Sequence, residues 1–205
     1  MNIVLDIGNV ICRWQPAELV ASVFPEGVEQ QAALRAVVEQ EDWLDLDRGV
    51  LELDLAVDRA AARSGLPRDL LAAVYEAVPR HLAPVPAMVA AIEQLAVAGA
   101  PLYVLSNMHR HAWAGLQRDH EFWDHFQGVL VSCEVGFIKP ERAIYAALCE
   151  QFSLQPAATV FLDDMPENVA AARDFGLRAE QVVDIDAGAA QLLSVAAELG
   201  YRQHL

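Results

Sequence analysis

Short apolar segments that end in polar residues alternate with helical segments along most of this chain. The apolar segments, each of strand length, are NIVL (2–5), PLYVLSN (101–107), GVLVS (128–132) and ATVFLDD (158–164). The helical patterns between and after them span residues 85–99, 141–152 and 166–176. Strands that alternate with helices of this length favour a parallel sheet covered on both faces. The sequence therefore predicts an α/β fold with a Rossmann-like, three-layer α/β/α core.

Residues 14–84 interrupt this alternation. Helical stretches lie near 16–24, 28–44, 53–64 and 67–80, with no convincing strand among them. We interpret this segment as an all-helical cap subdomain inserted after the first strand. The predicted core then consists of residues 1–13 and 85–205, with the cap at 14–84.

Charge and composition exclude several classes of partner. The formal net charge is −15, spread along the chain, and such a surface repels nucleic acid and anionic membranes. No apolar run approaches the roughly 20 residues that span a bilayer, and the N-terminus lacks a signal-peptide pattern. Three widely spaced cysteines indicate reduced thiols, so we expect a cytoplasmic protein. Nothing in the sequence indicates an oligomeric state.

Polar groups gather where the predicted strands end, and in parallel sheets the carboxyl ends of the strands form the ligand-binding edge. The chain has a single lysine, Lys139, in the loop phrase GFIKPE. The groups expected at this edge are Asp6, Ser106, Asn107, Lys139, Asp163 and Asp164. Gathered carboxylates repel one another unless a divalent cation joins them, and oxygen ligands suit Mg²⁺. The pattern therefore predicts a metal and a phosphate.

Four ordered motifs give the chain a resemblance to a known family. They are LDIGNV (5–10), VLSNM (104–108), GFIKPE (136–141) and FLDDMPENVAAARDFG (161–176). Together they resemble the haloacid dehalogenase-like hydrolase superfamily, in particular its helical-cap phosphatases. The first motif is similar to the DxGNV branch, which includes bacterial sugar-1-phosphate phosphatases such as the glucose-1-phosphate phosphatase. The last motif is similar to that of the phosphatase domain of soluble epoxide hydrolases.

The resemblance implies a role for each of the matching residues that handle the phosphate. It implies that Asp6 is the nucleophile and forms an aspartyl-phosphate that water hydrolyses. Ser106 and the backbone amides of Asn107 and Met108 would hold the phosphoryl oxygens. Lys139 would bridge Asp6 and the phosphate as a compact point charge.

The same resemblance implies a set of Mg²⁺ ligands. They are Asp6, the backbone carbonyl of Gly8 and an acid of the last motif. The spacing to Gly176 places Asp164 on the family's ligand position and Asn168 on its supporting partner. Asp163 ranks second as a ligand.

Position 8 departs from the usual DxD motif, in which the second acid transfers protons. Gly8 can offer a carbonyl to the metal but no carboxyl group. Turnover could continue with another acid, with water, or with a substrate whose leaving group needs little help, since general acid catalysis contributes about 10²- to 10⁴-fold. The alternatives are a catalytically weak or regulatory phosphate-binding protein and a metal-independent 2-haloacid dehalogenase. His109 and His111 could supply a proton, or they could be ordinary surface histidines.

The cap offers one further candidate site residue. Arg48, beside Gly49, could contact a phosphate or a sugar hydroxyl, or it could be a solvated charge. The nearby acids, which include Asp45 and Asp47, are interpreted as an exposed acidic face instead of a second metal site. The resulting hypothesis is a Mg²⁺-dependent phosphomonoesterase acting on a small phosphorylated metabolite, with a sugar phosphate as one candidate.

Overall fold

Five parallel strands form the central sheet in a computed structural model, which describes residues 1–25 and 27–201. The strands are β1 (Asn2–Leu5), β4 (Leu102–Ser106), β5 (Gly128–Val131), β6 (Thr159–Asp163) and β7 (Arg178–Gln181). Their order across the sheet is β5-β4-β1-β6-β7, and every pair is parallel. The predicted parallel sheet is confirmed. β1 lies at its centre, so Asp6 emerges in the middle of the carboxyl edge.

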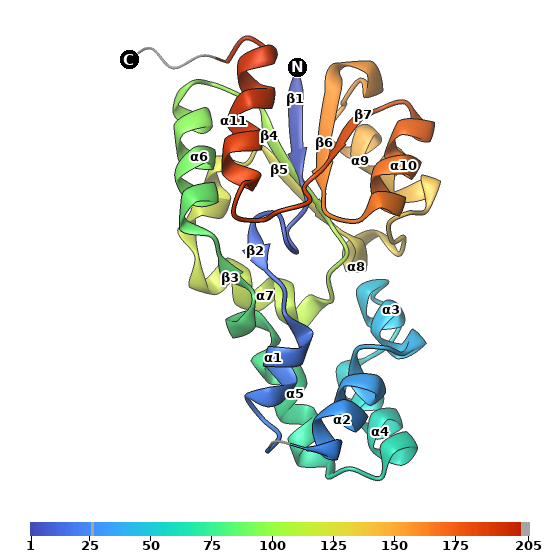
Figure 1. Cartoon of the computed structure of the whole chain (residues 1–205). Coiled ribbons are helices and arrows are strands. Elements are labelled where there is room, and N and C mark those ends of the chain that lie inside the picture. The colour runs from blue at the N-terminus through green and yellow to red at the C-terminus, as the bar shows by residue number, and fades with distance from the viewer. Residues whose placement is uncertain (26, 202–205) are drawn as a thin grey trace.

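Helices cover both faces of this sheet (Figure 1). The helices of the core are α6 (Pro86–Val97), α7 (Arg110–Asp119), α8 (Ser132–Val135), α9 (Arg142–Gln151), α10 (Pro166–Phe175) and α11 (Gly188–Glu198), with the 3₁₀ turns η1 (Glu121–His125) and η2 (Pro156–Ala158). Neighbouring strand residues point to opposite faces. Ile3 and Leu5 therefore pack with residues of α6 and α11, whereas Val4 packs with residues of α9 and α10. This is the predicted three-layer core.

Local sequence signals explain where several core helices begin and end. α10 begins with Pro166, which lacks the N–H that a first helical position leaves unpaired. It ends at Gly176, whose φ of +116° is a conformation that favours glycine. β7 and α11 lie beyond the segments that the sequence predicted as strands and helices.

Within the described residues, five helices lie between the first strand and the rest of the core. They are α1 (Pro16–Ala21), α2 (Val28–Val37), α3 (Glu41–Asp47), α4 (Leu53–Ser64) and α5 (Arg68–His81). They gather beyond the carboxyl ends of the sheet strands (Figure 1). The chain enters and leaves them through two short antiparallel strands, β2 (Cys12–Arg13) and β3 (Ala83–Pro84).

This helical segment differs in detail from the sequence prediction. The helix predicted at 28–44 is divided into α2 and α3, and the side chain of Gln40 donates a hydrogen bond to the carbonyl of Arg35 at 2.8 Å across the break. Neither glycine nor proline marks this break. β3 is a two-residue strand where none was predicted. The boundaries at 14 and 84 remain a proposal, and residues 26 and 202–205 of the predicted units lie outside the described residues.

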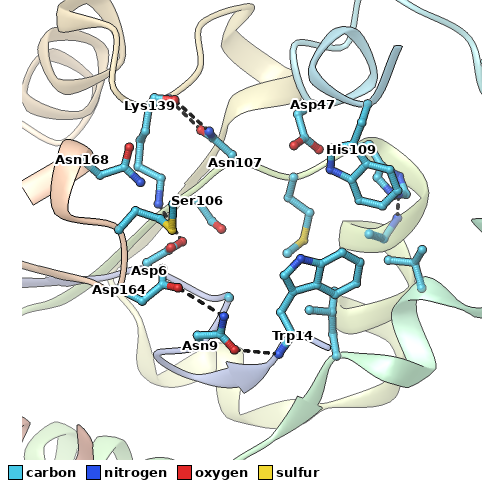
Figure 2. Close-up of a pocket in the computed structure, with 17 residues that line it drawn as sticks. Asp6, Asn9, Trp14, Asp47, Ser106, Asn107, His109, Lys139, Asp164 and Asn168 are labelled. Atoms are coloured by element: carbon cyan, nitrogen blue, oxygen red, sulfur yellow. Dashed lines mark hydrogen bonds and ion pairs between the residues drawn. The ribbon is translucent and has the colours of Figure 1, made fainter. Parts of the chain in front are cut away.

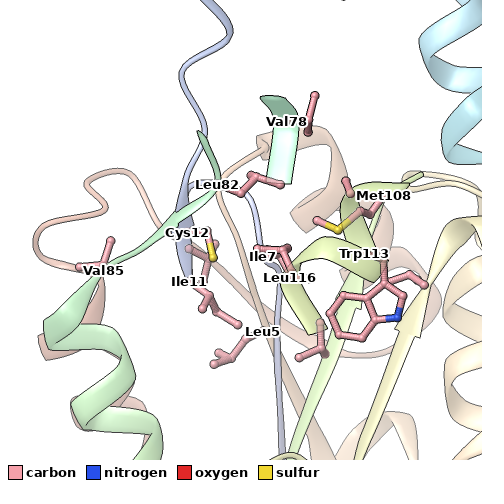
Figure 3. Packing of buried hydrophobic residues seen from close by; sticks show 14 of the residues in the cluster. Leu5, Ile7, Ile11, Cys12, Val78, Leu82, Val85, Met108, Trp113 and Leu116 are labelled. Carbon is pink, nitrogen blue, oxygen red and sulfur yellow. The ribbon is translucent and has the colours of Figure 1, made fainter. Parts of the chain in front are cut away.

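Apolar packing continues from the sheet into the helical segment. Ile7, Ile11 and Cys12 follow β1 and pack in the same buried cluster as Val78 of α5 and Leu82, the residue after α5 (Figure 3). The three cysteines are unpaired, as the sequence predicted. Among the described helices, none combines the length and apolar character needed to cross a membrane.

Candidate active site

A pocket of about 260 Å³ lies between the carboxyl edge of the sheet and the helical segment (Figure 2). Its polar residues are Asp6, Gly8, Asn9, Asp47, Ser106, Asn107, His109, Lys139, Asp164 and Asn168, and its apolar residues are Trp14, Trp43, Val78, Leu82, Met108, Ala112 and Met165. Asp6 follows β1, Ser106 ends β4 and Asp164 follows β6. Parallel topology thus brings together residues that are far apart in sequence.

The Lys139 ammonium lies at the base of this pocket. Its Nζ is 2.8 Å from Asp6 Oδ1 and 2.7 Å from Asp163 Oδ2, and it also donates to the carbonyl of Leu105 at 3.3 Å. The side chain is only 1% exposed. Burial acts to lower the pKa of Lys139, but the two carboxylates outweigh burial and raise it. Lys139 therefore remains a cation that joins two acids.

Asn107 fixes the backbone that carries this lysine. Its side-chain oxygen accepts from the Lys139 N–H at 2.7 Å, and its amide nitrogen donates to the Lys139 carbonyl at 3.0 Å. The backbone N–H of Met108, predicted to hold a phosphoryl oxygen, donates instead to Ser132 Oγ at 2.9 Å. Ser106 is buried, and its hydroxyl faces Asp6 and acts to lower the pKa of that carboxyl group.

Three carboxylates share the site. Asp6, Asp163 and Asp164 each offer an oxygen within 4.8 Å of the others. Burial raises the pKa of Asp6 to about 7, although Lys139 acts to lower it. One ammonium does not balance three carboxylates, so the donor set fits a hard divalent cation. Gly8 also lines the pocket.

Asp163 and Asp164 have different surroundings. Asp163 is fully buried, and besides Lys139 it accepts hydrogen bonds from Asn168 Nδ2 and the Met165 N–H, both at 2.9 Å. Asp164 is half-buried and lines the pocket, and it accepts from Asn9 Nδ2 at 3.2 Å. Asp164 is thus the acid of the pair that faces the pocket, while Asn168 supports Asp163.

Arg48, a predicted site residue, does not line the pocket. Its guanidinium forms two hydrogen bonds with the Glu141 carboxylate, at 3.0 and 2.5 Å. Glu141 belongs to the GFIKPE motif of the core. Arg48 therefore joins the helical segment to the core beside the pocket.

Asp47 is a pocket residue that sequence reasoning missed. The interpretation of an exposed acidic face is wrong for this position, because Asp47 is 5% exposed and lines the pocket. Burial raises its pKa to about 8. Trp43, four residues earlier on α3, lines the same pocket. The (i, i+4) spacing that puts these two side chains on one helix face was the signal available in the sequence.

The two histidines also differ from the surface interpretation. His109 is 3% exposed, and its Nδ1 accepts a hydrogen bond from the Ala112 N–H at the start of α7. Burial, with a smaller contribution from His111, lowers the pKa of His109 to about 4. Nε2 of the half-buried His111 lies 3.3 Å from Glu76. His109 is therefore neutral near pH 7 and has no imidazolium proton to supply.

The wall opposite the carboxylates is aromatic and aliphatic. Trp14 stacks on Trp43 with ring centroids 5.6 Å apart, and Trp43 stacks on Tyr75 at 6.1 Å. Val78 and Leu82 extend this wall. The pocket thus has a charged base and an apolar side.

Comparisons with known proteins agree with this geometry. The family model described as haloacid dehalogenase-like hydrolase matches residues 1–176. A sesquiterpene phosphatase, AstK, from Aspergillus oryzae is 28% identical over 177 residues, which cover 85% of each chain.

Solved structures show the same fold. A predicted HAD-like family hydrolase from Porphyromonas gingivalis has a TM-score of 0.74 and 21% identity, with 98% of each chain covered. A HAD family enzyme from Bacteroides thetaiotaomicron, solved in complex with magnesium and inorganic phosphate, has a TM-score of 0.68 and 20% identity, covering 88% of this chain and 92% of that one. Together with the family match, the ordered motifs and the parallel core establish that this chain belongs to the haloacid dehalogenase-like hydrolases.

Proposed function

We propose that this hydrolase is a Mg²⁺-dependent phosphomonoesterase in which Asp6 forms an aspartyl-phosphate. The observation that carries the proposal is the placement of Asp6, which lies 2.8 Å from the buried Lys139 ammonium and opens onto the pocket. An anionic nucleophile can attack a phosphate dianion only where cations offset their repulsion. Ser106 lies beside Asp6, in position to hold a phosphoryl oxygen.

The residues present suit a bound Mg²⁺. Asp6, Asp164 and the carbonyl of Gly8 would hold the ion, and Asp163 would hold Lys139 in place. Such an ion neutralises charge on the transferring phosphoryl group. Asn9 orients Asp164 through its 3.2 Å hydrogen bond, which favours a fixed ligand position.

The substrate class follows from the two sides of the pocket. The charged base suits the phosphate of a small phosphorylated metabolite, while Trp14, Trp43 and Leu82 suit an apolar organic group. The relationship to a sesquiterpene phosphatase supports the same choice. We therefore rank a monophosphate ester of an apolar alcohol above a sugar phosphate. Residues 14–84 would act as the cap that closes over this group.

The test is hydrolysis of p-nitrophenyl phosphate, a sugar-phosphate panel and isoprenyl monophosphates, each with Mg²⁺ and with EDTA. We expect Mg²⁺-dependent phosphate release that Asp6→Asn abolishes, with higher kcat/KM for the isoprenyl esters than for the sugars. The Asp124→Asn variant serves as a control, because Asp124 is an exposed acid outside the pocket.

Other outcomes would identify the alternatives. Phosphate binding without turnover would favour a regulatory phosphate-binding protein. Halide release from 2-haloacids without metal would favour a dehalogenase. Faster turnover of the sugar phosphates would overturn the apolar substrate class while leaving the phosphatase intact.

A further inference from the structure

The proposed reaction needs a proton donor that position 8 does not provide. In the first step the leaving alcohol must gain a proton, and in the second step water must lose one. Gly8 has no side chain for either transfer. His109 is neutral and uses Nδ1 as an acceptor at the start of α7, so it does not fill this role as an imidazolium.

The Asp47 carboxyl group enters the pocket from the opposite side. Asp47 is the last residue of α3, and Figure 2 shows its carboxyl group across the pocket from Asp6. Within the described residues, no lysine, arginine or histidine forms an ion pair with it. An in-line displacement at phosphorus places the leaving oxygen opposite the nucleophile. With Asp6 as the nucleophile, Asp47 would therefore lie on the side of the phosphoryl group from which the alcohol departs.

Contacts between the cap and the core hold Asp47 in this position. Its backbone carbonyl accepts a hydrogen bond from Ser132 Oγ at 2.5 Å, and Ser132 Oγ accepts from the Met108 N–H at 2.9 Å. Through Ser132, this chain of hydrogen bonds connects Asp47 to Met108, two residues after Ser106, which is proposed to hold a phosphoryl oxygen. The position of the carboxyl group is therefore tied to the position of the phosphate.

The two residues after Asp47 reinforce this attachment. Arg48 pairs with Glu141 through two hydrogen bonds. Gly49 has a φ of +72°, and a Cβ atom there would lie 2.4 Å from the carbonyl oxygen of Cys133. The cap backbone thus approaches the core more closely than a side chain would permit. The three consecutive residues form a docking segment that fixes Asp47 in the pocket.

We propose that Asp47, supplied by the cap, is the general acid and base that replaces the missing carboxyl group at position 8. This inference rests on the proposed phosphatase function. As Asp6 attacks phosphorus, the bond from phosphorus to the alcohol oxygen breaks, and the Asp47 carboxyl proton passes to that oxygen. The products are the free alcohol, the Asp6 aspartyl-phosphate and the Asp47 carboxylate.

In the second step, the Asp47 carboxylate accepts a proton from the attacking water. The water oxygen bonds to phosphorus, the bond between phosphorus and the Asp6 oxygen breaks, and inorganic phosphate leaves. Both aspartates return to their starting states. The two transfers balance without another reactant.

The groups that face Asp47 are consistent with an acid that is protonated before the first step. Burial raises the pKa of Asp47, and the Asp6 carboxylate adds to this increase. Lys139 and the backbone N–H of His109 act in the opposite direction without reversing it. Arg48, the adjacent cation, is directed to Glu141.

The test compares leaving groups in the Asp47→Asn variant. An alkyl alcohol needs its proton as the bond breaks, whereas p-nitrophenolate leaves without one. We expect kcat/KM for an alkyl phosphate to fall by about 10²- to 10⁴-fold and kcat/KM for p-nitrophenyl phosphate to fall by less than about tenfold. The alkaline limb of the wild-type pH profile should disappear in the variant. Asp45→Asn removes a carboxyl group from the same helix outside the pocket and should leave both substrates unaffected.

A second measurement addresses the hydrolysis step. Without its base, the variant should release one equivalent of p-nitrophenol per enzyme in a burst and then accumulate the aspartyl-phosphate. Equal losses for both leaving groups, or no loss for either, would overturn the role of Asp47 while leaving Asp6 as the nucleophile. Absence of turnover in the wild-type enzyme would overturn the phosphatase proposal and this inference together.

Discussion

Replacing Asp47 by asparagine should change how the free energy of unfolding depends on pH. Burial raises the pKa of Asp47 from 3.8 to about 8 in the folded protein. Between these values the folded state holds a proton that the unfolded state releases, so the free energy of unfolding decreases as pH rises. The stabilising contribution is fully present below the unfolded pKa and is lost as pH rises through the folded pKa. Asparagine is neutral throughout and has no such dependence.

The size of the effect follows from the number of pH units spanned. One bound proton changes the free energy of unfolding by about 1.4 kcal/mol per pH unit. From pH 5 to pH 8 the free energy of unfolding of the wild type should therefore decrease by at most about 4 kcal/mol. Because the pocket can partly relax around the charge, we expect a decrease of about 2 to 4 kcal/mol. The unfolding free energy of Asp47→Asn minus that of the wild type should increase by this amount.

Urea unfolding in EDTA at pH 5, 6, 7 and 8 measures this difference without a contribution from bound metal. The wild type, Asp47→Asn and Asp45→Asn should be compared at equal ionic strength. A difference between wild type and Asp47→Asn that is constant across this range would refute the assignment of a neutral, buried Asp47. A difference that decreases with pH would show instead that the ionised carboxylate stabilises the fold.

Three further predictions concern the core of the site. Lys139→Arg should lower kcat by at least about 100-fold. The planar guanidinium cannot replace a compact ammonium enclosed by Asp6, Asp163 and the Leu105 carbonyl. A kcat near that of the wild type would contradict this role of the ammonium. Asp164→Asn should raise the Mg²⁺ concentration for half-maximal activity at least about tenfold, measured beside the exposed control Glu167→Gln. Adding Gly8→Asp to the Asp47→Asn variant should raise its kcat/KM for an alkyl phosphate by at least about tenfold. Position 8 has room for the new side chain, because a Cβ atom there would meet only the Trp14 Cβ, at 3.9 Å. An unchanged kcat/KM would show that a carboxyl group at position 8 does not reach the alcohol.

The central strands were predictable because their sequences carry the signal of burial. Each contains a continuous apolar run, IVL (3–5) in β1 and VFL (160–162) in β6, as expected for strands covered on both faces. β7 was not predicted because it is an edge strand with the sequence RAEQ, in which only Ala179 is buried. Its position in the sheet depends on pairing with β6, which a local pattern does not reveal.

The site residues also divide into those that a local sequence pattern predicts and those whose position depends on contacts between distant segments. Asp6, Ser106 and Asp164 were predictable because parallel strands bring their carboxyl ends together whatever the details of packing. The position of Asp47 depends on how α3 docks onto α8, a contact between segments far apart in sequence. An acidic sequence such as LDLDRG is typical of a solvated turn, and only the docking of α3 onto α8 buries one of its carboxyl groups.

If Asp47 is the general acid, its place on the proposed cap would change what cap closure does in this enzyme. When the acid lies two residues after the nucleophile, both groups belong to the core and keep their separation whether the cap is open or closed. In the proposed mechanism Asp6 belongs to the core and Asp47 to the proposed cap, so the two would meet across one phosphate only when the docking segment 47–49 is in contact with Ser132, Cys133 and Glu141. Substrate exchange through an open cap would withdraw the proton donor together with the apolar wall. Closure would then exclude water and complete the catalytic set in one movement.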